Sequence, residues 1–367
     1  MTYITSIHSI GPDGHRRFVA ERLLKLKQRL QQDVSQVSNA GSLKLATWNI
    51  MHFGDGGAYT RTTESMLYIA EIIDHFDLVA IQEVNENLEA LNTLLRRNLG
   101  NDWDYLVTDA TGGTKGNSER LAFAYRRSKV WFRKEAGEIV LPTGQEIADP
   151  GTEQVGAKVQ FARTPFTVSF QSGWFKFKLC TVHIFYGKPG ERTPQMEHRR
   201  REIEKIAQVL ADRQQRQQRV LGDEANYILL GDFNIVSPEH ATMQALEAAG
   251  FTIPQAIKDA PSSLSGEHHY DQIAFRLADA RFRFRASGVF DMFDVIYRDE
   301  DVGHYIEVVK PASFELSSNG QPRTALQKAS YFRNYYRKHQ ISDHKLLWCE
   351  IKTDFSDDYL QNLQGLP

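Results

Sequence analysis

The chain has 367 residues, a formal net charge of −2 and 41% hydrophobic residues, a composition typical of a globular protein with one large domain or two. The near-neutral charge excludes a basic field over the whole molecule, so a site for a polyanion must be a local patch. No apolar run reaches the roughly 18 residues of a membrane span, and residues 1–18 lack the basic start and apolar core of a signal peptide.

The first predicted element is a helix at 15–37. Its apolar residues recur every three or four positions, at Val19, Leu23, Leu26, Leu30, Val34 and Val37. The stripe is short for an independent coiled coil, which favours docking on the domain surface. A partner helix or self-association through 15–37 is the alternative. Residues 38–42 predict a linker, so 1–42 form an N-terminal helical extension.

From residue 43, predicted strands alternate with predicted helices. Strands are expected at 43–48, 77–84, 120–126, 166–184 (a hairpin), 226–234, 269–277 and 345–351. Helices are expected at 62–76, 85–99, 195–218 and 238–250. The many strands and the hairpin favour an α+β fold, with two packed sheets and helices outside, over a doubly wound parallel sheet. We expect a catalytic domain at 43–351 and a C-terminal tail at 352–367.

Residues 296–340 break this pattern, because their periodicity is weak. They predict an inserted long loop or sub-element close to the strand that follows. The basic, aromatic run at 330–339 is suited to gripping a nucleic-acid strand through phosphate contacts and base stacking. The two cysteines, Cys180 and Cys349, lie inside apolar runs, which favours buried thiols in a reducing, cytoplasmic compartment.

Polar residues stand at the ends of the predicted strands. Asn49 and Glu83 each close a buried strand, and their hard oxygen donors suit Mg²⁺, Mn²⁺ or Ca²⁺. Taken singly, a turn asparagine and a helix-capping glutamate would also explain them. Asp343, beside His344, adds a second carboxylate that can bind a metal.

The string GDFN follows a buried strand and delivers two polar side chains past its end. Asp232 is placed to orient an attacking water, and the Asn234 amide is placed to bind a phosphoryl oxygen, while Gly231 permits a tight turn. His183 ends an alternating strand and is either a catalytic imidazole or a core histidine. An imidazole at His344 can transfer protons.

Further residues complete this set. Glu119 and Asp271 can each orient an imidazole, because a carboxylate that accepts the Nδ1 proton fixes the tautomer and raises the ring's basicity. Arg163 is a candidate phosphate clamp, since a guanidinium matches phosphate oxygens with two parallel hydrogen bonds. A surface arginine before a strand is the other interpretation.

In order, the strings TWNIMHFG, LVAIQEV, SERLAFAYR, FARTPF, CTVHI, GDFN, HYDQIAF and SDH resemble the endonuclease/exonuclease/phosphatase superfamily, and within it the deoxyribonuclease I branch. The resemblance covers roughly 43–351, without 296–340. It implies a four-layered α/β sandwich of two mixed sheets and metal-dependent hydrolysis of phosphodiesters. It further implies a metal site at Asn49, Glu83 and Asp343, and the dyads His183–Glu119 and His344–Asp271, with Asp232, Asn234 and Arg163 beside them.

Two positions depart from secreted deoxyribonuclease I. The residues that reach the DNA minor groove in that enzyme, an arginine and a tyrosine, are replaced here by Asn85 and Asn117. The sequence therefore predicts a nuclease that cuts DNA, and RNA as an open possibility, with a divalent metal, Mg²⁺ or Mn²⁺ with Ca²⁺ as a further option. A phosphatase or phosphodiesterase acting on small phosphoesters or lipid head groups is the alternative. A binding protein without catalysis is a third class.

Overall fold

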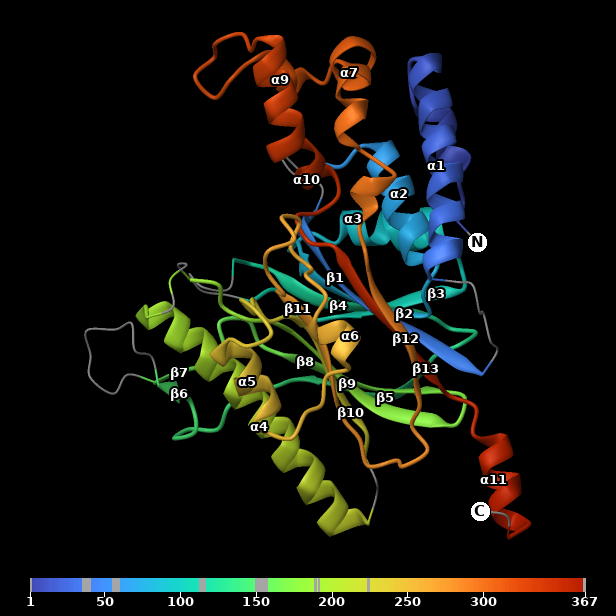
Figure 1. The fold of residues 1–367 in the computed structure, drawn as a ribbon, viewed down its shortest axis with the longest axis vertical. Helices are drawn as coiled ribbons and strands as arrows, with labels where there is room; N and C mark the ends of the chain where they lie inside the picture. The colour runs from blue at the N-terminus through green and yellow to red at the C-terminus, as the bar shows by residue number, and fades with distance from the viewer. Residues whose placement is uncertain are drawn as a thin grey trace.

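The computed structural model describes residues 2–34, 41–54, 60–111, 117–148, 158–187, 190, 192–222 and 225–365. Two sheets pack face to face, and helices cover their outer faces (Figure 1). The expected α+β sandwich of two mixed sheets flanked by helices is confirmed. None of the helices in the described ranges is long and apolar enough to cross a membrane.

The first sheet has six strands in the order β12-β13-β1-β2-β4-β3. Its strands are β1 (Ser42–Phe53), β2 (Leu78–Val84), β3 (Trp103–Val107), β4 (Arg120–Arg126), β12 (Phe284–Phe290) and β13 (Leu346–Lys352). Only β1 and β2 are parallel neighbours in this sheet; the other pairs are antiparallel.

The second sheet has five strands in the order β11-β10-β9-β8-β5. Its strands are β5 (Trp131–Glu138), β8 (Phe166–Ser172), β9 (Phe175–His183), β10 (Tyr227–Asp232) and β11 (Asp271–Arg276). Here β9 and β10 are parallel, and β6 (Ile147–Ala148) pairs with β7 (Lys158–Val159) separately. Each sheet therefore has one parallel pair, and both bear candidate site residues.

Helices form the outer layers. The first sheet carries α1 (Asp13–Asp33), α2 (Thr63–Ile73) and α3 (Glu89–Asn92), which continues as a π-helical segment, Thr93–Leu99. The second carries α4 (Pro194–Leu221) and α5 (Ala241–Glu247). The short α6 (Gln255–Lys258) contacts β11 and β12, and α11 (Ser356–Leu363) follows β13.

The alternation of side chains along each strand builds the layers. Leu43 and Leu45 of β1 belong to the core between the sheets, whereas Ala46, Trp48 and Ile50 belong to the core under α1 and α2. A third core joins β9 and β10 to α4 and α5. Strands that are buried on both faces explain the continuous apolar runs of the sequence. In keeping with the sequence prediction, both cysteines are buried free thiols.

The N-terminal helix α1 packs against α2. Five positions of its apolar stripe are buried, namely Val19, Leu23, Leu26, Leu30 and Val34, and Val37 lies outside the described residues. The packing favours docking at these positions over a partner helix. Of the predicted linker, residues 38–40 lie outside the described ranges.

Residues 296–340 form a helical sub-element, which is the second of the two predicted alternatives, and not a long loop. It consists of α7 (Val302–His304), a π-helical turn (Tyr305–Val309), α8 (Ala312–Glu315), α9 (Ala325–Tyr331), a π-helical turn (Phe332–Tyr336) and α10 (Arg337–Gln340). Figure 1 shows it rising beside α1. Its aromatic side chains enter the core shared with α1 and α2, and they include Tyr297, Tyr305, Phe314, Phe332 and Tyr336.

The predicted nucleic-acid grip needs a correction. Phe332 is fully buried and Tyr336 is 7% exposed, so neither ring can stack on a base. Tyr335 is 57% exposed, and its ring stacks on that of Tyr331 with the centroids 5.8 Å apart. The exposed residues of the run are therefore Ser330, Arg333, Asn334 and Tyr335.

Candidate active site

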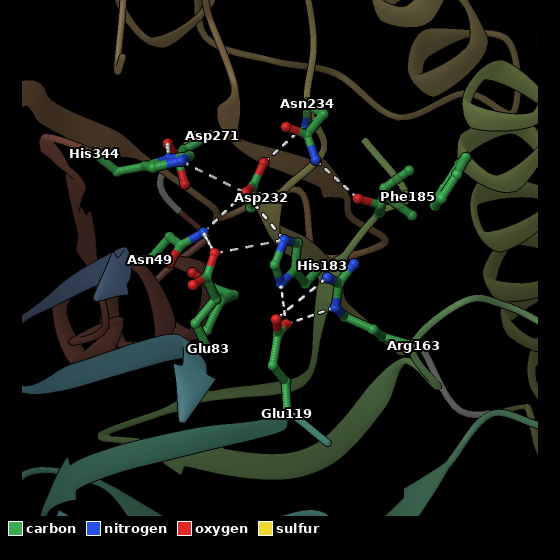
Figure 2. A network of polar contacts seen from close by, with 12 residues as sticks. Asn49, Glu83, Glu119, Arg163, His183, Phe185, Asp232, Asn234, Asp271 and His344 are labelled. Atoms are coloured by element: carbon green, nitrogen blue, oxygen red, sulfur yellow. Dashed lines mark hydrogen bonds and ion pairs between the residues drawn. The ribbon is translucent and has the colours of Figure 1, made fainter. Parts of the chain in front are cut away.

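The first sheet contributes polar side chains from the ends of four strands (Figure 2). Asn49 of β1 lies opposite the residue of β2 that precedes Glu83. Glu119 immediately precedes β4, and His344 lies two residues before β13. Because β1 and β2 are parallel and their antiparallel neighbours begin where they end, all four side chains reach the same edge.

The second sheet brings three more side chains to that edge. Asp232, at the end of β10, is paired in register with His183 of β9 on one side and with Asp271 of β11 on the other. The candidate site therefore lies where the edges of the two sheets meet, and both sheets supply it (Figure 2).

Asp232 lies at the centre of this network and is 1% exposed. Its Oδ2 atom accepts a hydrogen bond from Asn49 Nδ2 at 3.0 Å. The same oxygen lies 3.5 Å from His183 Nε2 and 3.7 Å from His344 Nε2. One buried carboxylate thus faces the outer nitrogens of both imidazoles, where it can attract a proton that either of them carries.

The first dyad joins His183 to Glu119, with Nδ1 of the imidazole 3.0 Å from Oε2. Arg163 Nε donates to the same oxygen at 2.6 Å, and its Nη2 donates to Oε1 at 3.3 Å. Burial would raise the pKa of Glu119, but His183 and Arg163 outweigh it and lower the pKa to about 2. The carboxylate is therefore ionised wherever the protein is folded at neutral pH.

Arg163 is 8% exposed, so it is no surface arginine. Two of its nitrogens hold Glu119 in place, which makes it a positioning residue for the first dyad. A direct contact of its guanidinium with a substrate phosphate stays a prediction.

The second dyad joins His344 to Asp271, with Nδ1 2.8 Å from Oδ2. Burial would lower the pKa of His344, but Asp271 and Asp232 raise it well above its usual value. The backbone of His344 is fixed on both sides. The backbone N–H of His344 donates to Ser342 Oγ, and the backbone carbonyl of His344 accepts from Trp48 Nε1. Ser342, the first residue of the SDH string, thus fixes the turn that presents His344.

The turn after β10 is fixed by close backbone packing. Gly231 has φ +133°, and a Cβ atom there would lie 2.2 Å from the Val182 carbonyl oxygen. Asn234 has φ +54°, its N–H donates to Asp232 Oδ1 at 2.9 Å, and its Nδ2 donates to the Ile184 carbonyl at 2.8 Å. A hydrogen bond from the Asn234 amide to phosphate stays a prediction.

Arg199 of α4 is a functional neighbour that the sequence interpretation missed. Arginines of a long polar helix usually lie on its solvated face, but Arg199 is 2% exposed and its Nη1 donates to the Asn234 carbonyl at 2.9 Å. Its position, four residues before Ile203 and seven before Ile206 on the buried stripe, was the signal in the sequence. Burial lowers its pKa.

The donor set fits a divalent cation. Glu83 is 15% exposed and accepts from Asn49 Nδ2 at 2.9 Å, and Asn49 Oδ1 is buried with no hydrogen-bond partner in the described structure. An orphaned amide oxygen beside a carboxylate is the pair that a hard cation requires. A metal role for both residues stays a prediction.

Asp343 stands apart from the other predicted ligands. Its side chain is half-buried, and its backbone carbonyl accepts from Leu264 N–H. Its charge contributes to the raised pKa of His344, but the polar network drawn in Figure 2 does not include it. The structure thus joins nine of the ten predicted residues by contacts and leaves Asp343 as a neighbour of the second dyad.

Two further residues contact the site and were not singled out from the sequence. His52 donates its backbone N–H to Glu83 Oε2 at 2.9 Å, and its Nδ1 lies 3.7 Å from the same oxygen. Tyr270 stacks obliquely on His344, with ring centroids 5.4 Å apart. His52 lies at a register irregularity of β1 and Tyr270 immediately precedes β11, and a sequence pattern does not specify the geometry at either position.

Comparison with known proteins places the chain in a family whose description agrees with the fold and the site. The profile of the Endonuclease/Exonuclease/phosphatase family matches residues 46–344, and the chain belongs to this family of nuclease-like and phosphatase-like hydrolases. It is 30% identical over 212 residues to a deoxyribonuclease of Thioalkalivibrio sp. (strain K90mix), covering 56% of this chain and 50% of that protein. It is 32% identical over 197 residues to deoxyribonuclease-1 of Bos taurus, covering 53% of this chain and 61% of that protein. The predicted resemblance to the deoxyribonuclease I branch is confirmed.

These matches span less than two thirds of either relative. Among solved structures, the fold superimposes on a mannosyl-6-phosphatase of Bacteroides thetaiotaomicron VPI-5482 with a TM-score of 0.52 and 17% identity. That superposition covers 84% of this chain and 99% of the other, and it supports the fold.

Proposed function

We propose that this chain is a divalent-metal-dependent phosphodiesterase that cleaves DNA by attack of water on phosphorus. The observation that carries the proposal is the pair of imidazole–carboxylate dyads whose outer nitrogens face one buried carboxylate, Asp232. Hydrolysis of a phosphodiester needs one group to take the water's proton and one to protonate the leaving oxygen, and two imidazoles supply both.

The two imidazoles are not equivalent. His344 lies between two carboxylates that raise its pKa, so it carries a proton at neutral pH and is the better general acid. We therefore assign His183 as the base, oriented by Glu119. Asp232 lies between them and can hold the attacking water or balance the charge that moves.

The metal would be held by Asn49 and Glu83, with Asp343 a further predicted ligand. When bound, a divalent cation would neutralise the charge that develops on the phosphoryl oxygens. Asn234 would add a hydrogen bond to one of those oxygens, and Arg163 would keep Glu119 ionised and in place.

Two observations support DNA as the substrate. The relatives described above are named deoxyribonucleases. Residues 323–340, which lead directly into the SDH turn, contain five lysines and arginines and no acidic residue. RNA is a second substrate to test, because neither Asn85 nor Asn117 reproduces the minor-groove contacts of the secreted enzyme.

The test is a substrate panel with the purified chain. We expect nicking of supercoiled plasmid with Mg²⁺ or Mn²⁺, its loss with EDTA, and its loss in His183→Ala. Single-stranded DNA, RNA, inositol phosphates, sugar phosphates and sphingomyelin complete the panel. Turnover of a small phosphoester without cleavage of any nucleic acid would replace the nuclease proposal with the phosphatase alternative.

Two further expectations from the sequence stay predictions. A cytoplasmic location can be checked by fractionation of cells that express the chain. Self-association through 15–37 can be checked by measuring the mass in solution, and we expect a monomer because five positions of the α1 stripe are buried within the chain.

A further inference from the structure

A groove opens on the outer face of the second sheet, at the end away from the two dyads. Its volume is about 590 Å³, and its walls include Trp131 of β5, Trp174 of the turn between β8 and β9, and Lys176 of β9. Phe175 and His183 are the two ends of β9, so at about 3.3 Å per residue the groove lies about 25 Å from the dyads. The groove is therefore separate from the candidate active site.

The helix layer over the second sheet ends before the groove. Side chains alternate along β9, so Lys176, Lys178 and Cys180 point to the same outer face. Cys180 is fully buried in the core shared with α4 and α5, whereas Lys178 is half-buried and Lys176 is exposed. The first half of β9 therefore presents a sheet surface to solvent and not to a helix.

One row of side chains crosses three strands on this surface. Trp131 of β5 is paired in register with Gln171 of β8, and Gln171 is paired with Lys176 of β9. Neighbours in such a row lie about 5 Å apart, so an indole, an amide and an ammonium group stand side by side. Trp174 adds a second indole, whose centroid lies 5.6 Å from that of the Tyr359 ring. The row therefore places polar groups next to two indoles.

The two indoles differ from the other tryptophans of the chain in their exposure. Trp131 is 58% exposed and Trp174 is 45% exposed, whereas Trp48, Trp103 and Trp348 are buried. Tryptophan combines a large apolar ring with a hydrogen-bond donor, and it is enriched where proteins bind other molecules. Two exposed indoles in one groove therefore indicate a surface that stacks on planar or ring-shaped groups.

The acidic side chains at the groove are paired with cations. Asp279 lines the groove and lies 2.9 Å from Arg281 Nη2. Glu135 lines a smaller hollow that also includes Lys176, and it lies 2.6 Å from Lys178 Nζ. Neither carboxylate therefore adds a negative charge that is left without balance.

Two further cations make the face positive. Lys176 lines the groove, Arg133 lines the adjoining hollow, and both side chains are exposed. Within the part of the chain that the structure describes, neither side chain forms an ion pair. Sites for single-stranded nucleic acid combine cations that contact phosphates with aromatic rings on which bases stack. The positive charge favours such a polyanion over a neutral sugar.

We propose that this groove binds single-stranded nucleic acid outside the active site. Bases stack on Trp131 and Trp174, Lys176 and Arg133 contact phosphates, and the Gln171 amide faces the strand between them. The nucleotides beyond the groove remain free to reach the dyads at the other end of the sheet. The choice of ligand rests on the proposed nuclease function, and a neutral oligosaccharide is the competing ligand in the test.

The exposed indoles provide the reporter, because a stacked base quenches tryptophan fluorescence and the three buried tryptophans cannot stack. A short oligothymidylate is titrated into the full-length protein in EDTA, so that the strand is not cut. Trp131→Ala removes a ring, Trp131→Phe keeps one, and Lys176→Gln removes a charge. Arg96→Gln, at an exposed position in the segment Thr93–Leu99, is the charge control. Thermal melts check that each variant is folded.

We expect quenching by the oligothymidylate and less quenching by a duplex of the same length, whose bases are stacked on one another. Trp131→Ala should weaken binding by about 5- to 150-fold, read from Trp174, and Trp131→Phe should weaken it less. Lys176→Gln should reduce the slope of log affinity against log salt by about 0.7, and Arg96→Gln should leave it unchanged.

Three results would overturn the proposal: quenching by maltoheptaose and not by the oligothymidylate, equal quenching by the duplex, or unchanged affinity in Trp131→Ala. Binding is measured without a metal, so it is separable from catalysis. A chain that binds the oligonucleotide through Trp131 but cuts no nucleic acid would retain this surface and lose the proposed function. A chain that cuts DNA but binds equally well in Trp131→Ala would retain the function and lose the surface.

Discussion

Asp232 lies where two differently tuned imidazoles meet. His344 is paired with a fully buried carboxylate, Asp271, and His183 with a carboxylate that Arg163 also holds. The neighbours, more than the residue types, distinguish the two histidines. Tests at the residue scale should therefore separate their roles and not only detect their importance.

The acid can be distinguished from the base by the leaving group. His344→Ala should lower kcat on DNA by about 10²–10⁴-fold, but much less on a nitrophenyl phosphodiester, whose leaving group departs without a proton. His183→Ala should lower both rates, because both substrates need an activated water. Steady-state kinetics on the two substrates provide the measurement, and equal losses in His344→Ala on both would contradict the assignment.

The ionisation of Glu119 should appear in the stability of the fold. Its folded pKa of about 2 lies below the ordinary value of 4.5, so the carboxylate stabilises the folded state above pH 4.5, and this stabilisation is lost as the pH falls toward 2. Glu119→Gln should lower the free energy of unfolding at pH 7 by at most about 3 kcal/mol, with the difference shrinking between pH 4.5 and 2. Urea titrations across this range measure it.

The control for that series is Glu86→Gln, at an exposed position. The difference in free energy of unfolding between Glu86→Gln and the unmodified protein should be the same at every pH. A difference for Glu119→Gln that stays constant from pH 7 to pH 2 would show that its charge does not stabilise the fold.

At the scale of elements, strong periodicity predicted structure well. The stripe of α1 is buried as expected, and α2 begins as the sequence indicates, with the Thr62 hydroxyl accepting from Ser65 N–H. Strands buried on both faces, such as β2 and β10, appear as continuous apolar runs. These elements are specified by local pattern, so the sequence alone was enough.

Elements that depend on distant contacts were missed. β5 reads WFRKEAGE and is mostly exposed, and β12 reads FRASGVF with a glycine in its middle. Both are edge strands, which are held by one neighbour and need few apolar residues. Residues 296–340 were unclear because their aromatics pack against α1 and α2, which lie far away in the sequence.

The same contrast holds within the site. Motif residues at strand ends were predictable because parallel strands end at one edge. The position of His52 depends on an irregularity of β1 and that of Arg199 on the buried face of α4, so neither follows from the strand-end rule.

Two neighbouring aromatics of the sub-element should behave in opposite ways. Phe332 is fully buried, so Phe332→Ala should destabilise the fold by about 3–5 kcal/mol. Tyr335 is exposed, so Tyr335→Ala should leave the melting temperature nearly unchanged and weaken single-stranded DNA binding by about 1–3 kcal/mol, the value of one base stacked on an aromatic ring. Thermal melts and fluorescence anisotropy measure the two effects.

Leu326→Ala serves as the control for binding, because Leu326 is 85% exposed and cannot stack on a base. If Tyr335→Ala binds single-stranded DNA as tightly as Leu326→Ala does, the grip predicted for this run is wrong.

For the whole molecule, the most consequential feature is that each dyad spans both sheets. His183 belongs to β9 and its partner Glu119 precedes β4, while His344 precedes β13 and its partner Asp271 begins β11. The proposed catalysis therefore depends on how one sheet is placed on the other. Gln82 links them directly, because its Nε2 donates to Thr181 Oγ1 at 2.9 Å and to Thr47 Oγ1 at 3.1 Å.

Removing this link should affect stability and rate together. Gln82→Leu leaves two buried hydroxyls without their partner and should cost about 1–3 kcal/mol of stability. It should also lower kcat while the folded fraction stays complete at 25 °C, because the dyads lose their alignment. Gln171→Leu, on β8 away from the site, is the control, and an unchanged kcat in folded Gln82→Leu would contradict the argument.

The order of the strands has a consequence for synthesis of the protein. β13 follows every other described strand in the sequence, yet it lies between β12 and β1 in the first sheet, and His344 enters the site with it. A chain still on the ribosome lacks one dyad and an interior strand until that segment has emerged. We therefore expect the proposed activity to begin only when translation has passed β13.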